Sequence, residues 1–490
     1  MLDSTASQSA RTARFDTTPA SDAPRTVAAA ASARFALCSL SAPFLVFCAL
    51  LGGCGPSESE PDHHAGPPHV ILISVDALRQ DHLGLYGYER DTSPWLDDFA
   101  EQSVVFERAY TAGTWTLISH MSMFTGLYPE QHGIYADGTR LADEIPTLAE
   151  RLQARGYHTA SLYYEGWIHE RFGFDRGFDV VRHHEEAQAM ARHARELLDT
   201  RPPDQPLFLF LHAWDVHSAR MNQDSGSTIY NPPSGYDTLW VPDARERLDG
   251  VIKPVLVYKG KLHPTPEQRE AIVALYDGNV RYVDDVLGEI LGAYEEAGLL
   301  DNALVIVTSD HGEALNQREG YGGHGDFFEE GLRVPLVMRF PRGAGAGTRR
   351  SETVSLVDLL PTVLDELGAP REPWLQGLPL QHELPRDRMI LLQRPPKSAL
   401  LQWPWKLRWK TIQDLRRAQL YNLEDDPEEL APLLWHTHRA RFDEMVGALA
   451  QVREKLMASW APVPGDVVPG SAPTPEEIQL LEELGYLGDG

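Results

Sequence analysis

The segment His69–Val75, with the sequence HVILISV, gives the first information about the fold. A run of apolar and β-branched residues without polar alternation is typical of a strand that is buried on both faces. Runs of the same kind recur at 206–212 (PLFLFLH) and 303–309 (ALVIVTS), and an amphipathic pattern over 265–297 predicts a long helix closed by Gly298. Strands that alternate with helices predict an α/β protein whose sheet is covered by helices on both faces.

Acidic residues and histidines follow these strands at the points where the strands end. Asp76 follows the first strand, Asp215 and His217 follow the second, and Asp310 and His311 follow the third. Ligand sites of such sheets collect at the carboxyl ends of the strands. A buried carboxylate is destabilising unless a metal ion or another cation offsets its charge, and adjacent carboxylate and imidazole groups are suitable metal ligands. The alternative for Asp76 is a cap on the next helix.

Two further segments carry polar residues in a setting that suits a site. Thr116, Ser119 and His120 lie in TAGTWTLISHMSMFTGLYPEQHG (111–133), although a Thr or Ser before an apolar run is commonly only a helix cap. His324 lies in the sequence YGGHG, where glycines permit close approach of the backbone to a ligand. The alternative there is a flexible glycine loop with an incidental histidine.

The composition excludes some functions. The 490 residues include 44 Lys and Arg against 71 Asp and Glu, which gives a net charge of −27. Such a chain is a poor partner for nucleic acid, whose phosphates are bound through Lys and Arg. An anionic small substrate is not excluded, because a metal ion and a few local cations can reverse the local field. The cysteines Cys38, Cys48 and Cys54 all lie in the first 54 residues, so the rest of the sequence offers no disulfide, Cys-ligated zinc or thiol nucleophile.

The N-terminal part has the layout of an export signal. Arg34 precedes an apolar run at 35–51, and Leu-Gly-Gly-Cys follows at 51–54; a basic residue, an apolar stretch and small residues are typical of a secretory signal. The ending resembles a bacterial lipobox, so we expect Cys54 to carry a lipid, with a transmembrane anchor as the alternative. We therefore expect a protein that is exported and lipid-anchored to a bacterial membrane, on the periplasmic or cell-surface side, with no other membrane contact.

The pattern of expected strands and helices changes along the chain. From about residue 385, short aromatic segments and one helical pattern replace the alternating strands and helices, which predicts a smaller α+β subdomain. The expected parts are a signal segment at 1–53, a Pro-rich tether at 54–67, a main domain at 68–384, a C-terminal subdomain at 385–460, and a tail with a short helix at 461–490.

Several segments, taken in order, carry a family resemblance. They are VDALRQDHLGLYGY (75–88), TSPWLDDFA (92–100), FTGLYPEQHG (124–133), SDHGE (309–313), GHGDFFEEGLRVPLV (323–337) and YNLEDDPEE (421–429). Together they resemble the sulfatase family of the alkaline-phosphatase-like superfamily over about residues 66–460. The resemblance implies an alkaline-phosphatase-like central sheet flanked by helices, followed by the smaller C-terminal subdomain.

The nucleophile position departs from the family pattern. Sulfatases carry Cys-x-Pro-Ser-Arg, whose Cys is oxidised to formylglycine, and alignment without gaps from Thr125-Gly126 places Thr116 at the Cys, Ser119 at the Ser and His120 at the Arg. Formylglycine cannot form from Thr. Related superfamily members, such as the nucleotide pyrophosphatase/phosphodiesterases, use a metal-bound Thr instead, so the resemblance predicts Thr116 as nucleophile and Ser119 and His120 as substrate contacts.

The resemblance also implies the remaining site residues. The expected metal ligands are Asp76, Asp310, His311 and Thr116 Oγ. Because calcium prefers more oxygen ligands than this set offers, the set favours one divalent zinc or manganese ion. Calcium is the alternative. The resemblance further predicts His217 and His324 as catalytic residues and Asp215 as a substrate contact. A second metal ion on Asp215, His217 and His324 is a further option.

These assignments predict a metal-dependent hydrolase of sulfate, phosphate or phosphonate esters, either small or linked to a glycan or lipid. The Lys and His of the family's GKWH segment are missing at 163–166, which weakens the expectation for sulfate. Two alternatives stay open: a transferase of the phosphoethanolamine type, and a catalytically inactive binding protein with the sulfatase fold.

Overall fold

The computed structural model describes residues 66–135, 138–218, 229–248, 263–318, 321–410, 417–458 and 468–469. All of them belong to one structural unit, 62–490. The predicted signal segment, Cys54 and most of the predicted tether and tail lie outside the described residues, and the predicted domain boundaries stay predictions. Within the described ranges, no helix has both the length and the apolarity of a membrane span.

A large mixed sheet forms the centre of the described part, in the order β10-β2-β11-β7-β1-β6-β4-β5, with β12 paired to β2. The three predicted buried strands are confirmed as β1, β6 and β7, and β1 lies parallel between the other two. The strand bounds are β1 His69–Val75, β2 Val104–Tyr110, β4 His158–Tyr164, β5 Val180–His184, β6 Leu207–Ala213, β7 Ala303–Thr308, β10 Arg333–Val334, β11 Leu336–Arg339 and β12 Thr348–Ser355.

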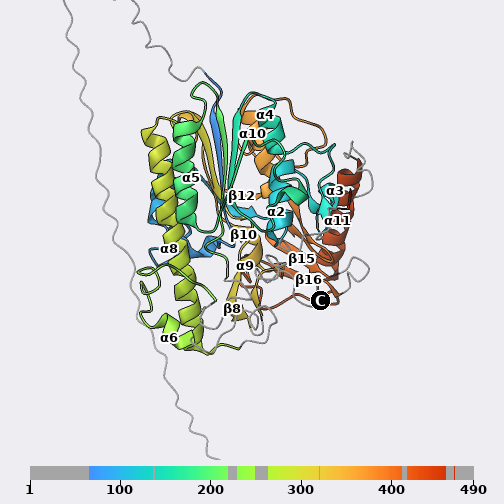
Figure 1. The fold of residues 1–490 in the computed structure, drawn as a ribbon. Coiled ribbons are helices and arrows are strands. Elements are labelled where there is room, and N and C mark those ends of the chain that lie inside the picture. The colour runs from blue at the N-terminus through green and yellow to red at the C-terminus, as the bar shows by residue number, and fades with distance from the viewer. Residues whose placement is uncertain are drawn as a thin grey trace, which may run out of the picture. The chain divides into compact units, whose positions relative to one another are not determined.

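Helices cover both faces of this sheet (Figure 1). On one face lie α1 Pro94–Glu101, α5 Ala187–Thr200 and α8 Pro266–Glu296; on the other lie α2 Thr116–Thr125, α4 Leu148–Gln153 and α10 Leu359–Glu366. The predicted long helix is α8, which Thr265 caps through its side chain and Gly298 follows with a φ of 74°.

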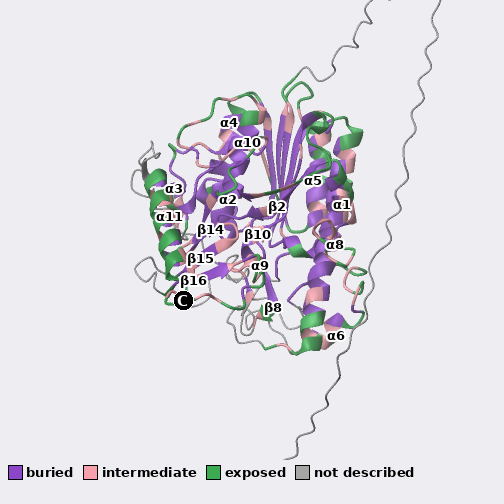
Figure 2. Cartoon of the chain, turned by 180° about the vertical axis from the view of Figure 1, so that it is seen from behind, coloured by how far each residue is buried: buried purple, intermediate pink, exposed green. Residues whose placement is uncertain are grey.

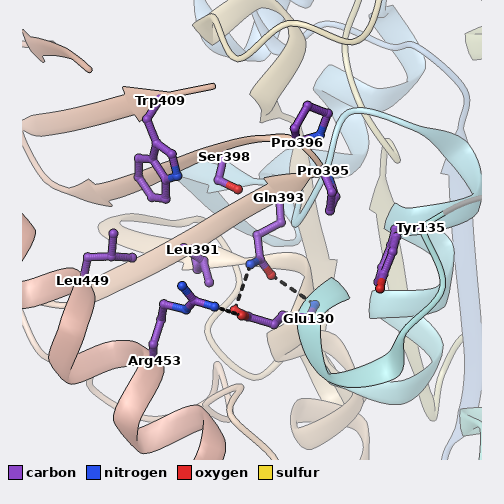
Figure 3. Close-up of a pocket in the computed structure, with 10 residues that line it drawn as sticks. All are labelled: Glu130, Tyr135, Leu391, Gln393, Pro395, Pro396, Ser398, Trp409, Leu449 and Arg453. Carbon is purple, nitrogen blue, oxygen red and sulfur yellow. Dashed lines mark hydrogen bonds and ion pairs between the residues drawn. The ribbon is translucent and has the colours of Figure 1, made fainter. Parts of the chain in front are cut away.

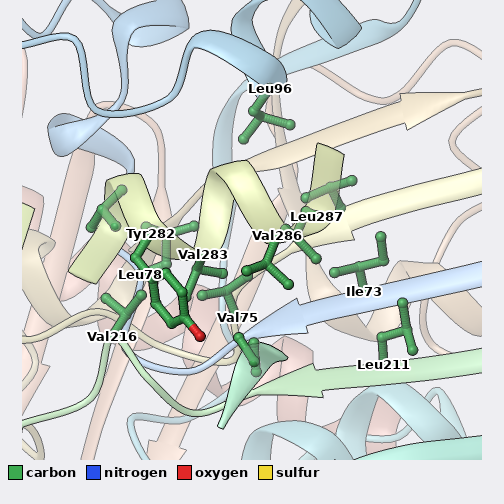
Figure 4. Packing of buried hydrophobic residues seen from close by; sticks show 14 of the residues in the cluster. Ile73, Val75, Leu78, Leu96, Leu211, Val216, Tyr282, Val283, Val286 and Leu287 are labelled. Atoms are coloured by element: carbon green, nitrogen blue, oxygen red, sulfur yellow. The ribbon is translucent and has the colours of Figure 1, made fainter. Parts of the chain in front are cut away.

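The alternation of side chains along β1 explains its unbroken apolar sequence. Ile71 and Ile73 pack into one hydrophobic core with α5 and α8, whereas Val70 and Leu72 pack into a second core with α2, α4 and α10. Figure 4 shows the first core, in which Ile73 and Val75 approach Val286 of α8. Because successive residues of a strand point to opposite faces, a strand between two helical layers must be apolar at nearly every position.

The chain ends in a smaller α+β subdomain, as predicted. Its antiparallel sheet has the order β13-β14-β15-β16, and α11 packs against it through the third hydrophobic core, which includes Phe442 and Met445. Figure 2 shows the central strands as buried and α11 with an exposed outer side. The bounds are β13 Met389–Arg394, β14 Lys397–Gln402, β15 Trp405–Trp409, β16 Gln419–Asn422 and α11 Arg439–Ala458.

Shorter elements connect these parts. They are η1 Gln80–His82, η2 Gly84–Tyr86, α3 Pro129–His132, β3 Thr139–Arg140, η3 Glu170–Phe172, α6 Ala244–Leu248, β8 Ala314–Arg318, β9 Tyr321–Gly323, α9 Glu329–Leu332, η4 Pro341–Gly343, η5 Leu356–Asp358 and β17 Val468–Pro469.

Candidate active site

Parallel pairing of β1 with β6 and β7 brings the carboxyl ends of the three strands to one edge of the sheet. Asp76 follows β1, Asp310 and His311 follow β7, and helix α2 begins with Thr116 at the same edge. The Oγ1 atom of Thr116 lies 3.4 Å from Asp76 Oδ2 and 3.4 Å from His311 Nε2. The His311 Nε2 atom is in turn 3.6 Å from Asp76 Oδ1 and 3.5 Å from Asp310 Oδ2. The structure thus brings together the four predicted metal ligands.

The chemistry of this cluster fits a divalent cation. Asp76 and Asp310 are fully buried, and among the described residues Asp76 Oδ1 and Asp310 Oδ2 have no hydrogen-bond partner. Burial, together with the Asp310 carboxylate, raises the pKa of Asp76 well above its usual range. His311 Nδ1 donates to the carbonyl oxygen of Gly312 at 3.0 Å, which leaves the lone pair on Nε2, as a metal ligand requires. Two buried carboxylates and one such imidazole are a donor set that a zinc or manganese ion would satisfy.

The loop after β1 is held in place by side chains from two other elements. Asp310 Oδ1 accepts hydrogen bonds from the backbone N–H of Ala77 at 3.3 Å and of His311 at 2.9 Å. Ser309 Oγ accepts a hydrogen bond from the backbone N–H of Leu78. The hydroxyl of Tyr276 in α8 accepts one from the backbone N–H of Arg79. Ala77 has a φ of 58°, a left-handed conformation that a non-glycine residue adopts at some cost. These bonds hold it there and keep the adjacent Asp76 in position.

His217 and His324 lie beside this cluster. The ring of His324 stacks on that of His311 with centroids 4.6 Å apart, and its centroid is 5.0 Å from that of His217. Glu313 completes a second group of possible ligands, with its Oε1 atom 4.0 Å from His324 Nδ1. The Glu313 carboxylate also accepts hydrogen bonds from the hydroxyls of Ser218 at 2.7 Å and Tyr230 at 2.8 Å.

The structure does not place Asp215 in the second group. Its carboxylate accepts a hydrogen bond from the backbone N–H of Ala187 at 3.1 Å, at the first residue of α5. The sequence analysis did not single out Glu313. Its position three residues after Asp310 was a signal, since a charged residue so close to the end of a buried strand is destabilising unless it has a partner. His212, the penultimate residue of β6, was also missed; its Nε2 atom is 3.5 Å from Asp76 Oδ2.

Ser119 and His120 are fully buried. The Ser119 hydroxyl accepts a hydrogen bond from Thr111 at 2.9 Å. His120 Nδ1 donates to the carbonyl oxygen of Thr116 at 2.9 Å, and its Nε2 atom lies 2.9 Å from the Ser74 hydroxyl. These contacts anchor the first turn of α2 to β1 and to the preceding loop, and so hold Thr116. The substrate-binding role of Ser119 and His120 stays a prediction.

Aromatic side chains lie beside Thr116. Tyr164, Trp167 and Trp214 line a narrow pocket together with Asp76 and Thr116. The rings of Tyr164 and Trp214 stack with centroids 4.7 Å apart. Of the segment 163–166, where the sulfatase pattern has a Lys and a His, Tyr164 and Gly166 line this pocket.

A roomier pocket of about 350 Å³ lies at the junction of α3, the β13–β14 hairpin and α11 (Figure 3). Its polar groups are partners of one another: Glu130 pairs with Arg453, and Gln393 Nε2 donates to the Glu130 carboxylate at 3.2 Å. None of the clustered carboxylates and histidines of the strand edge lines it. We assign this pocket to the junction between the main domain and the C-terminal subdomain.

Comparison with known proteins agrees with this fold and site. The family model Sulfatase matches residues 68–369. The chain is 24% identical to a choline-sulfatase of Rhizobium meliloti, covering 81% of this chain and 87% of that protein, and 34% identical to arylsulfatase K of Canis lupus familiaris, covering 79% and 82%. A crystal structure of the phosphonate monoester hydrolase of Agrobacterium radiobacter superposes with a TM-score of 0.63 at 21% identity, covering 80% of this chain and 96% of that one.

The protein is therefore a hydrolase of sulfuric or phosphoric esters. It belongs to the sulfatase family of the alkaline-phosphatase-like superfamily, a metal-dependent family.

Proposed function

We propose that this protein hydrolyses sulfate, phosphate or phosphonate esters with Thr116 as nucleophile and with one divalent ion, zinc or manganese, held by Asp76, Asp310 and His311. The observation that carries the proposal is the position of Thr116 Oγ1, 3.4 Å from both Asp76 Oδ2 and His311 Nε2. A hydroxyl that serves only as a helix cap would bond to backbone N–H groups of its own helix. This one instead lies among the predicted metal ligands.

The bound ion would neutralise charge on the ester oxygens and lower the pKa of the hydroxyl, which is otherwise a weak nucleophile. The hydroxyl of Thr116 hydrogen-bonds to Asp76, and this contact directs the oxygen that forms the new bond to sulfur or phosphorus. The ester bond to the alcohol then breaks, and the alcohol oxygen takes up a proton. Water releases the group from Thr116 in a second step and restores the hydroxyl.

His217 and His324 are the proposed proton carriers for the leaving oxygen. Both rings lie beside His311, with the His217 and His311 centroids 6.3 Å apart, so a leaving group next to Thr116 would be within their reach. His217 Nδ1 donates to the Ser218 carbonyl oxygen at 2.9 Å, and this bond fixes the orientation of the ring.

The proposed substrates are small or glycan- or lipid-linked esters. Relatives by name act on a choline sulfate and on aryl sulfates, and the structural neighbour acts on phosphonate monoesters.

A substrate panel tests this proposal. The purified protein is assayed on an aryl sulfate, a phosphate monoester, a phosphate diester and a phosphonate monoester, after chelation and after return of zinc, manganese or calcium. We expect turnover of at least one ester that is lost on chelation and recovered with zinc or manganese. We also expect a fall of about a thousandfold or more in Thr116→Ala at unchanged metal content, and partial retention of activity in Thr116→Ser.

Full metal-dependent activity of Thr116→Ala would show that the nucleophile is wrongly assigned. Product analysis with and without an acceptor alcohol separates hydrolysis from transfer. A purified protein that binds no divalent ion and turns over none of the esters would instead be a non-catalytic binding protein.

A further inference from the structure

The proposed site contains more negative charge than one divalent ion can balance. Asp76, Asp310 and Glu313 are all fully buried, and a sulfate or phosphate ester brings one or two further negative charges. Like charges at such distances repel strongly in a buried site. The positions at which the family resemblance would place cations carry His120, His324 and the segment 163–166, which contains no Lys or Arg. A further cation near the ester oxygens would offset part of this charge.

Arg394, the last residue of β13 in the C-terminal subdomain, reaches the loop that leads into Thr116. Its Nη1 atom donates to the carbonyl oxygen of Thr114 at 3.0 Å. Its guanidinium carbon lies 5.5 Å above the ring of Trp115. The guanidinium is thus fixed against the two residues that immediately precede the nucleophile.

The same guanidinium also lies against the loop that carries His324. A Cβ atom built on Gly325 would be 2.3 Å from Arg394 Nη1 and 3.1 Å from its guanidinium carbon. Gly325 also has a φ of 114°, so this position requires glycine both for its conformation and for the approach of the arginine.

We propose that Arg394 binds the anionic oxygens of the substrate's sulfuryl or phosphoryl group, and so supplies from the C-terminal sheet the charge that the strand-edge loops lack. This inference rests on the proposed function. A guanidinium has several N–H donors in one plane and matches the oxygens of a tetrahedral oxyanion. Its bond to Thr114 and its contact with Gly325 leave it held between the nucleophile loop and the His324 loop, where such an oxyanion would lie.

Two neighbouring cations provide matched controls, because they hold the same glycine loop by other contacts. Lys397 Nζ donates to the Gly325 carbonyl oxygen at 3.3 Å and lies 3.5 Å from Asp326 Oδ1. Arg408 lies 3.6 Å from the same carboxylate oxygen. If Arg394 served only to hold this loop, loss of Lys397 would have a comparable effect.

The test is calorimetric titration of the full-length, metal-loaded protein with inorganic phosphate and with inorganic sulfate, combined with KM and kcat for the best ester of the panel. We expect Arg394→Gln to weaken anion binding and raise KM by about ten- to a hundredfold, as for a lost charged hydrogen bond, and Arg394→Lys to recover part of this loss. Lys397→Met is expected to bind the anions within about twofold of wild type. Metal content and the thermal midpoint show that each variant is folded and loaded.

The proposal is overturned if Arg394→Gln binds phosphate and sulfate as wild type does, if Lys397→Met weakens binding equally, or if the wild-type protein binds neither anion. Failure of this proposal can be distinguished from failure of the proposed function. A wild type that binds the anions through Arg394 but hydrolyses no ester would refute the activity and keep the anion site.

Discussion

The two carboxylate oxygens of Asp310 make different contacts at the strand edge. Oδ1 accepts the backbone N–H groups of Ala77 and His311, whereas Oδ2 faces the cluster, 3.5 Å from His311 Nε2. An asparagine could keep the first task, because its carbonyl oxygen accepts the same two bonds. It would lose the negative charge and place an amide donor beside Asp76.

Asp310→Asn should therefore have opposite effects on the protein with and without metal. We expect metal affinity to fall by more than about a hundredfold, while the chelated protein gains about 1–3 kcal/mol of stability, since one of two adjacent buried carboxylates is removed. Metal titration and thermal unfolding in chelator measure the two effects. Unchanged metal affinity, or a less stable chelated protein, would contradict the assignment of Asp310 as a ligand.

His132 in α3 is a neutral buried histidine outside the site. Its Nδ1 atom accepts the backbone N–H of Ile134 at 3.0 Å, and its Nε2 atom lies 3.1 Å from the Ser122 hydroxyl. Burial lowers the pKa of His132 to about 3. In the unfolded chain the imidazole takes up a proton below its usual pKa of about 6.5, so the free energy of unfolding must fall as the pH drops from about 6.5 towards 3.

A single histidine of this kind changes stability by up to about 1.4 kcal/mol per pH unit within that window. We expect His132→Asn, measured by urea unfolding of the chelated protein between pH 4 and pH 6.5, to show a shallower pH dependence than wild type by about this amount. Identical slopes would mean that His132 carries a proton in the folded protein.

At the scale of single residues, sequence order predicted which residues meet at the strand edge better than it predicted the supporting contacts. Asp76, Asp310 and His311 follow strands that pair in parallel, so their convergence follows from the α/β pattern alone. The directions of Ser119, His120 and Asp215 depend on packing that a local sequence does not encode. Arg394 could not be inferred, because it reaches the site from a separate sheet nearly 280 residues after Thr116.

At the scale of elements, the C-terminal sheet contacts the main domain through a buried charge cluster as well as through apolar side chains. Lys406 of β15 is fully buried, with its Nζ atom 2.9 Å from Glu329 Oε1 in α9 and 2.7 Å from Glu429 Oε1. The α+β character of this subdomain was predictable from its short strands, but its contact with α9 was not, because the pattern of apolar residues says nothing about which charges will pair.

Lys406→Met should be strongly destabilising. Removal of the ammonium group leaves two carboxylates buried without their cation, at a cost of about 3–5 kcal/mol, and Glu429→Gln in addition should restore part of it. The control is Arg195→Met, whose exposed ion pair with Glu289 is expected to contribute at most about 1 kcal/mol. Urea unfolding monitors both, and a loss below about 1 kcal/mol for Lys406→Met would contradict this role.

At the scale of the whole molecule, the sequence predicts a targeting signal in addition to the fold. Residues 1–53 and Cys54 lie outside the described residues, and we propose that they export the protein and attach it by a lipid to a bacterial membrane. The strand-edge site would then face the outside of that membrane, in a chain whose full sequence has a net charge of −27.

Replacement of Cys54 by Ser tests this proposal, because it removes the thiol at the proposed site of lipid attachment. In a bacterial host, we expect the wild-type chain to fractionate with membranes and to enter the detergent phase on phase separation, whereas Cys54→Ser should not be lipidated. Equal partitioning of the two proteins into detergent would refute lipid attachment at Cys54.

The central claim, that Thr116 is the nucleophile of a metal-dependent ester hydrolase, is tested most directly by mass spectrometry of the acid-quenched enzyme during turnover of its best ester. We predict that the peptide containing Thr116 gains the mass of one sulfuryl or phosphoryl group, that the gain disappears on chelation, and that Thr116→Ala never shows it. Rapid metal-dependent turnover by the wild type with no such adduct under any quench, or an adduct on another residue, would contradict the claim.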